Sequence, residues 1–81
     1  MTVRLFGIFR LKSEISRLTL DINQGAELFS ALSLKFSGID EKEWEKSVLY
    51  LNGKLIPLNK FKKIKLETQD EVLIMSPVSG G

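Results

Sequence analysis

The last ten residues, Val72-Leu73-Ile74-Met75-Ser76-Pro77-Val78-Ser79-Gly80-Gly81, are the part of the sequence on which the prediction of the fold depends. The apolar run 72–75 is typical of a buried strand. We expect that strand to end before Pro77, because proline cannot donate a ladder hydrogen bond. The residues that follow are small and end in two glycines. Chain ends often carry no function, and a terminal Gly-Gly can be a linker. A function for the tail can therefore be inferred only together with the fold of the domain before it.

The composition is that of one small globular domain. The chain has 81 residues, of which 43% are hydrophobic and 27% charged, and its net charge of +2 does not by itself indicate a nucleic-acid-binding protein. It contains no cysteine and no histidine, so the usual ligands of transition metals and the commonest general base are missing. No apolar run reaches the length of a membrane span, and no secretory signal is visible. We therefore expect a cytoplasmic protein without a metal site and without membrane association.

The first third of the chain alternates as strands do. Residues 2–11 are predicted to form a strand whose core face carries Val3, Leu5, Gly7 and Phe9. Residues 12–14 are predicted to form a turn, and residues 16–22 a second strand that directs Leu18, Leu20 and Ile22 inward. The two strands would make a hairpin.

The period then changes from two to that of a helix. Leu28, Phe29, Leu32 and Phe36 recur at helical spacing, so residues 23–38 are predicted to form the main helix, with its apolar stripe in the core. Asp40 and Glu43 are spaced as a capping box, which predicts a short helix near residues 41–45. The acidic residues there alternate with lysines, which favours a solvated face over a cation site. Trp44 is expected to anchor this connection to the domain.

The second half of the chain contains a strong hairpin signal. Residues 47–51 are predicted to form the third strand, and Asn52-Gly53 is typical of a two-residue turn. A short return strand is predicted to contain Leu55, Ile56 and Leu58, and Pro57 marks it as an edge strand. A lysine-rich segment, 60–65, precedes the last strand, which is predicted over residues 71–76. The order is therefore strand, strand, helix, strand, short strand, strand.

This order and the Gly-Gly ending resemble an α+β fold, the β-grasp or ubiquitin-like fold. More narrowly, the chain resembles the sulfur-carrier family that includes the small subunit of molybdopterin synthase (MoaD-like) and the thiazole sulfur carrier (ThiS-like). The segments that carry the resemblance are 51–53 (Leu-Asn-Gly), 70–72 (Asp-Glu-Val) and 77–81 (Pro-Val-Ser-Gly-Gly). Gln69, Ser76 and Ser79 depart from residues common in the family, but none of them touches the two terminal glycines. The length of the chain favours the MoaD-like branch.

The resemblance implies a β-grasp domain over residues 1–76 and a flexible tail over residues 77–81. It implies that the chain is not an enzyme and binds no cofactor itself. An E1-like adenylating partner would use ATP to activate the Gly81 carboxylate. A sulfur donor such as a cysteine desulfurase or rhodanese would then convert it to a thiocarboxylate. The sulfur would later be delivered to an acceptor held by the large subunit of molybdopterin synthase. Gly80 and Gly81 are thus the expected reactive end, since residues without Cβ can pass a narrow channel.

In a β-grasp sheet the first and last strands should lie side by side and parallel near its centre. Alternation along each strand then collects apolar side chains on the face that the helix leaves open, and such a patch is typical of a docking surface. The residues expected to bind partners, including two in the tail, are Phe6, Ile8, Tyr50, Leu73, Met75, Pro77 and Val78. The alternative is that arginines such as Arg4 and Arg10 shield this face.

The other interpretations also remain open at this point. The lysines at 60, 62, 63 and 65 can be a solvated surface, a dock for an acidic partner, or part of a pocket for an anionic substrate. Nucleic acid is disfavoured, because Phe61 is the one aromatic among them and no RNA-binding signature is present. The same tail could serve thiazole synthesis, tRNA thiolation or attachment to protein lysines. A different class is a β-grasp binding module in which the Gly-Gly is incidental.

Overall fold

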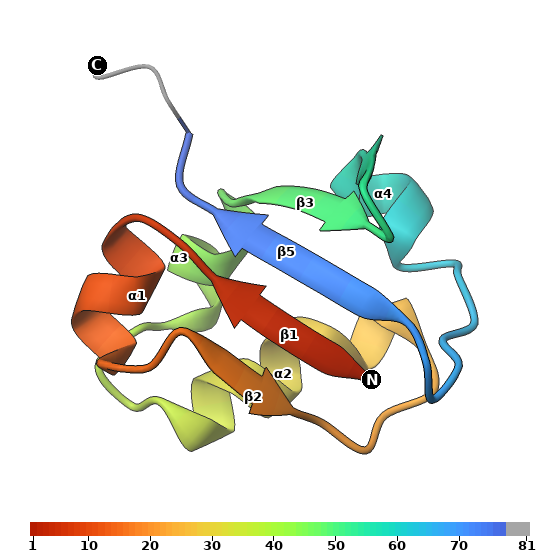
Figure 1. The fold of residues 1–81 in the computed structure, drawn as a ribbon. Helices are drawn as coiled ribbons and strands as arrows, with labels where there is room; N and C mark the ends of the chain where they lie inside the picture. The colour runs from red at the N-terminus through yellow and green to blue at the C-terminus, as the bar shows by residue number, and fades with distance from the viewer. Residues whose placement is uncertain (78–81) are drawn as a thin grey trace.

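The computed structural model describes residues 1–77 and contains a five-stranded mixed sheet (Figure 1). The strands are β1 (Thr2–Leu5), β2 (Arg17–Thr19), β3 (Val48–Leu51), β4 (Lys54–Ile56) and β5 (Glu71–Met75). Their order in the sheet is β2-β1-β5-β3-β4, and β1 and β5 are parallel at its centre, whereas the other pairs are antiparallel. The predicted α+β, β-grasp architecture is therefore confirmed.

Helices lie against one face of the sheet and at one end of it (Figure 1). They are α1 (Ile8–Ser13), the short 3-10 helix η1 (Gly25–Glu27), α2 (Leu28–Lys35), α3 (Glu41–Glu45) and α4 (Leu58–Phe61). Figure 1 shows α2 and α3 behind the sheet and α1 at one end of it, and none of the helices within residues 1–77 lies over the face toward the viewer. The core between sheet and helices contains fully buried side chains from both layers, among them Val3, Leu5, Leu28, Leu32, Leu49, Phe61, Val72 and Ile74.

The predicted first strand is too long, because the chain leaves the sheet at Gly7. The Phe6 N–H still donates to the Ile74 carbonyl at 2.9 Å, but Gly7 then adopts φ 64° and ψ −137°, and α1 begins at Ile8. The predicted turn at 12–14 is instead the end of α1, where Glu14 has φ 65°. β1 and β2 are antiparallel neighbours as predicted, but a helix rather than a tight turn connects them.

The helical segments after β2 follow the predicted pattern, although the main helix is shorter than predicted. The main helix α2 buries Leu28, Phe29 and Leu32, as the spacing predicts, and η1 precedes it. The short helix α3 is confirmed together with its cap, since Asp40 Oδ1 accepts from the Glu43 N–H at 2.9 Å. Trp44 is fully buried and stacks on Phe9 with ring centroids 4.8 Å apart, so it does anchor the connection.

The predicted hairpin between β3 and β4 is also confirmed. Asn52 and Gly53 have φ values of 51° and 85°, as the two central residues of a type I′ turn require. β4 lies at the edge of the sheet, as predicted. The return strand ends earlier than predicted: Leu58 begins α4, because Pro57 precedes it with an extended ψ of 147° and ends the ladder.

Two features concern membrane association and metal binding. No helix within residues 1–77 is long and apolar enough to cross a membrane. In the same part of the chain no group of three or more acidic side chains is placed to hold a metal ion.

Candidate functional site

The C-terminal tail leaves the domain from the end of the central strand β5. Met75, the last residue of β5, pairs with Val48 at the start of β3, and Ser76 and the exposed Pro77 follow it. Figure 1 shows the chain departing between the loop before α1 and the start of β3. The predicted site residues Val78, Gly80 and Gly81 lie outside the described residues. The structure therefore describes only Ser76 and Pro77 of this segment, which we call the tail root, and the surface around them.

Gly7 is packed directly against this root. A Cβ built on Gly7 would collide with Ser76 Oγ and would lie 3.5 Å from Ser76 Cβ. With its positive φ, Gly7 meets two conditions that favour glycine, an unusual backbone conformation and a close approach of another residue. The start of α1 thereby lies beside the point at which the tail departs.

The strand register places a row of side chains across the open face of the sheet. Arg4 is opposite Leu73, Leu73 is opposite Tyr50, and Tyr50 is opposite Leu55. The neighbours of Leu73 in β5, Val72 and Ile74, are fully buried on the helix-covered face. Because side chains alternate along a strand, the row lies on the face that no helix of the described residues covers.

Four of the predicted docking residues share this open face or its border. Tyr50, Leu73 and Met75 lie on it by strand register, and all three are half-buried. Phe6, also half-buried, directly follows β1, and the Arg4 guanidinium carbon lies 5.6 Å from the centroid of its ring. That distance is typical of a cation–π contact, so an arginine does cover part of the apolar surface, as the alternative interpretation anticipated.

Ile8 was predicted on this face, and the structure contradicts that position. It is the first residue of α1 rather than part of a strand, because the extended backbone ends at Gly7. Ile8 remains 45% exposed, and Leu11, three residues later in the same helix, is 78% exposed. Both leave apolar surface open on the helix that lies next to the tail root.

Leu55 and Val48 are open-face residues that sequence reasoning missed. Leu55 is 58% exposed and opposite Tyr50, and Val48 is half-buried and opposite Met75. The signal was present in the sequence, since a two-residue turn at Asn52-Gly53 fixes Leu51 opposite Lys54 and Tyr50 opposite Leu55. The apolar part of this surface, which we call the open-face patch, consists of Phe6, Val48, Tyr50, Leu55, Leu73 and Met75.

Comparison with known families decides the classification. The family model described as "ThiS family" matches residues 3–81, which is nearly the whole chain and includes the two terminal glycines. The chain therefore belongs to the ThiS family. It is a small β-grasp protein of the sulfur-carrier and modifier type, and carriers of this family are not themselves catalysts.

Solved structures of two other small proteins resemble this one over nearly their full length. Small archaeal modifier protein 1 (SAMP1) from Methanosarcina acetivorans is 25% identical, with a TM-score of 0.80 and coverage of 99% of this chain and 94% of that chain. A chain in the complex of subunits 1 and 2 of molybdopterin-converting factor from Helicobacter pylori 26695 is 27% identical, with a TM-score of 0.67 and coverage of 99% and 96%.

Urm1 from Sulfolobus solfataricus shares the fold. It is 14% identical, with a TM-score of 0.71 and coverage of 95% of this chain and 100% of that chain. A search of curated proteins gave no match.

Proposed function

We propose that this ThiS-family protein carries sulfur as a thiocarboxylate on Gly81. The observation that carries the proposal is the family match, which extends through Gly80 and Gly81 to the last residue of the chain. The described geometry supports it, because the tail root is at the end of the central strand and is bordered by the open-face patch. The chain offers a reactive end and a surface on which an enzyme can hold it.

The chemistry requires partners, because a carboxylate is a poor electrophile. An E1-like enzyme transfers AMP from ATP to the Gly81 carboxylate and releases pyrophosphate. A persulfide on a cysteine desulfurase or rhodanese then attacks the acyl-adenylate and expels AMP, and a thiol reduces the resulting S–S bond to leave the thiocarboxylate. The carrier contributes its unhindered C-terminal carbonyl, since glycine places no side chain beside the reacting carbon.

Molybdopterin synthesis is the acceptor pathway that we propose for the sulfur. The similarity to a chain of the Helicobacter pylori molybdopterin-converting factor supports it, at 27% identity over 99% of this chain. In this role the protein is the small subunit of a molybdopterin-synthase-like pair, and the large subunit holds the pterin that accepts the sulfur.

Attachment to protein lysines is the second candidate, favoured by the similarity to SAMP1, whose name describes a modifier. Both roles begin with the same acyl-adenylate and differ in the nucleophile that attacks it. A persulfide gives the thiocarboxylate, whereas a lysine amine gives an isopeptide bond. Thiazole synthesis and tRNA thiolation would use the same thiocarboxylate, and a β-grasp binding module would use none of this chemistry.

Intact-mass spectrometry tests the proposal. The untagged protein is incubated with ATP, a sulfur donor and the E1-like enzyme of its own organism, and replacement of one oxygen by one sulfur at Gly81 is expected. A chain with one alanine added after Gly81 should remain unmodified, whereas an N-terminally tagged chain should react. Equal behaviour of the two variants contradicts the carrier role.

A second experiment tests the pathway. Binding of the thiocarboxylated chain to the large subunit of molybdopterin synthase supports the molybdopterin pathway, and Gly81 linked to protein lysines supports the modifier role.

A further inference from the structure

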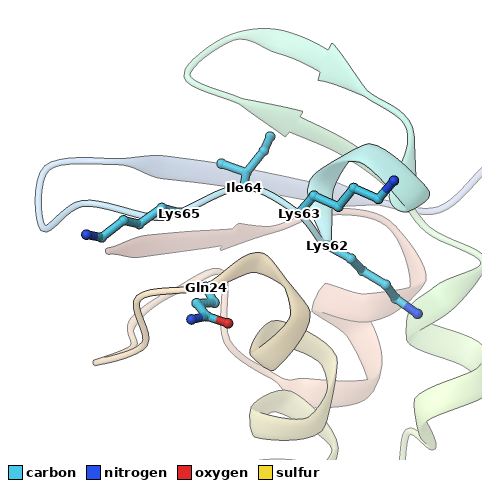
Figure 2. A pocket seen from close by; sticks show the side chains of 5 residues that line it. All are labelled: Gln24, Lys62, Lys63, Ile64 and Lys65. Atoms are coloured by element: carbon cyan, nitrogen blue, oxygen red, sulfur yellow. The ribbon is translucent and has the colours of Figure 1, made fainter.

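Four lysines gather on a surface that the proposed sulfur chemistry does not use. Lys60, Lys62, Lys63 and Lys65 are all exposed, and they make up four of the 12 basic residues of the chain within six positions. Three of them line a hollow of about 370 Å³ together with Gln24 and Ile64 (Figure 2). We call these four residues the lysine cluster.

The backbone that carries the cluster is held firmly. The Gly25 N–H donates to the Ile64 carbonyl at 2.8 Å, and the Leu66 N–H donates to the Asn23 carbonyl at 2.8 Å, so the two segments form a short antiparallel bridge. Phe61, between Lys60 and Lys62, and Leu66, directly after Lys65, are both buried. These apolar anchors leave the lysine side chains to point outward, and the cluster is a fixed cationic surface rather than part of a loose loop.

The geometry distinguishes between classes of anionic ligand. Figure 2 shows the ammonium groups of Lys62, Lys63 and Lys65 pointing in three directions, so they do not converge on one small anion. Lys62 lies 3.5 Å from Glu45, which ties one of the charges to the domain's own surface. Phe61 is fully buried and offers no face on which an RNA base could stack. Cations that are spread over a surface, with no aromatic side chain for base stacking, favour an acidic protein surface over a small anion or RNA as the ligand.

The cluster lies away from the root of the tail. In Figure 1 the segment after α4 runs along the end of the sheet at which β5 begins, whereas the tail root is at the other end of β5. The domain measures 31 × 24 × 19 Å, so a partner that contacts both must extend along much of its length. A large enzyme that holds the tail fits this requirement.

We propose that the lysine cluster docks on an acidic surface of the E1-like enzyme that adenylates Gly81. This inference rests on the proposed function. Adenylation is the step that the sulfur-transfer and modifier pathways share, so the partner is the same whichever pathway the chain serves. The step also brings the negative Gly81 carboxylate toward the triphosphate of ATP. Attraction at the far end of the domain offsets that repulsion and accelerates encounter without adding cations to the active site.

Steady-state adenylation kinetics test the docking site. Pyrophosphate release is measured against carrier concentration at low and high salt for wild type, for Lys63→Glu/Lys65→Glu, and for Lys35→Glu/Lys42→Glu. The two variants lower the net charge equally, and the second pair is exposed on α2 and α3. We expect the cluster variant to raise KM about fivefold at low salt with unchanged kcat, and to weaken the salt dependence, because peripheral charges act mainly on association. The control pair should behave as wild type.

Any other result of these kinetic measurements contradicts docking through the lysine cluster. Equal effects of the two pairs would mean that net charge alone matters, and an unchanged KM would mean that the cluster does not touch the enzyme. Binding of tRNA or of ATP by the carrier alone, lost in Lys63→Glu/Lys65→Glu, would assign the cluster to a different ligand. If the wild type is not adenylated at all, the proposed function fails and the inference fails with it. Circular dichroism and thermal unfolding verify that both variants are folded.

Discussion

Asn52 and Asp70 are 18 positions apart in the sequence, yet their side chains are hydrogen-bonded, with Asn52 Nδ2 donating to Asp70 Oδ1 at 3.0 Å. Asn52 Oδ1 also accepts from the Glu71 N–H at 2.9 Å, and Asp70 Oδ2 accepts from the Glu67 N–H at 2.7 Å. The turn that joins β3 to β4 is thus tied to the loop that leads into β5. The Leu-Asn-Gly and Asp-Glu-Val segments, which carried the resemblance at the sequence level, meet in space and fix the start of the tail-bearing strand.

This contact predicts a pH-dependent contribution to stability. The hydrogen bond from Asn52 and then that from the Glu67 N–H hold the pKa of the Asp70 carboxyl below its ordinary value, and partial burial opposes them. In the unfolded chain the pKa is about 3.9. The folded state is therefore favoured above that pH, and the contribution is lost as pH falls from about 4 through the lower pKa of the folded state. Urea unfolding of the wild type between neutral and acidic pH should show this loss.

Asp70→Asn isolates the effect. Two N–H donors face the two carboxylate oxygens, and asparagine offers only one acceptor, so we expect lower stability than wild type at neutral pH. The difference between the two proteins should shrink at acidic pH. Asp21→Asn is the matched control, because Asp21 is exposed and has no side-chain hydrogen bond within residues 1–77. A gap between wild type and Asp70→Asn that stays constant with pH would contradict the assignment.

Gly7→Ala is expected to destabilise the domain at the root of the tail. Alanine at φ 64° and ψ −137° is strained, and its Cβ would collide with Ser76 Oγ. We expect a loss of about 1–3 kcal/mol in the free energy of unfolding, measured by chemical denaturation. Combining it with Ser76→Ala removes the collision but not the backbone strain, so the double variant should recover part of the loss. Additive effects of the two substitutions would show that the residues are not coupled.

Trp44→Ala tests the anchor of the connection between α2 and β3. The indole is fully buried, stacks on Phe9 with ring planes 12° apart, and lies 6.2 Å from the Phe36 ring centroid. We expect a loss of about 3–5 kcal/mol in stability, as for other large aromatic side chains removed from a core. Trp44→Phe should cost less, because it keeps most of the stacking and removes an indole N–H that has no hydrogen-bond partner within residues 1–77. A greater loss of stability in Trp44→Phe than in Trp44→Ala would contradict the described packing of the indole.

Local chemistry accounts for the elements that could be predicted from the sequence. The Asn52-Gly53 turn, the Asp40–Glu43 cap and the spacing of Leu28 and Leu32 each depend on residues within a few positions of one another, so pattern reasoning reaches them. The missed helix α1 has a different cause. Leu5 and Phe9 are both buried, and a separation of four places residues on one face in a strand as well as in a helix.

The same distinction applies to the candidate site. Alternation predicted the open-face positions of Tyr50, Leu73 and Met75, because strand pairing keeps the side-chain period. Ile8 was assigned wrongly because the prediction continued the strand through Gly7. Gly7 and Ser76 are far apart in the sequence, so their contact could not be predicted from the pattern of neighbouring residues.

The open-face patch is expected to bind the adenylating enzyme, and Leu55 offers a clear test. It is 58% exposed on the edge strand β4, so Leu55→Asp should leave the fold intact while it places a charge in the docking surface. Leu34 is 88% exposed on α2, away from the open face, and Leu34→Asp is the control. We expect Leu55→Asp and Met75→Asp to weaken binding at least about fivefold by calorimetry, which corresponds to about 1 kcal/mol, whereas Leu34→Asp should bind as wild type.

Wild-type affinity in a folded Leu55→Asp variant would exclude this edge of the patch from the interface. The same affinity in Met75→Asp would exclude the whole face, and the enzyme would then hold the carrier by its tail and by surfaces such as the exposed side of α1.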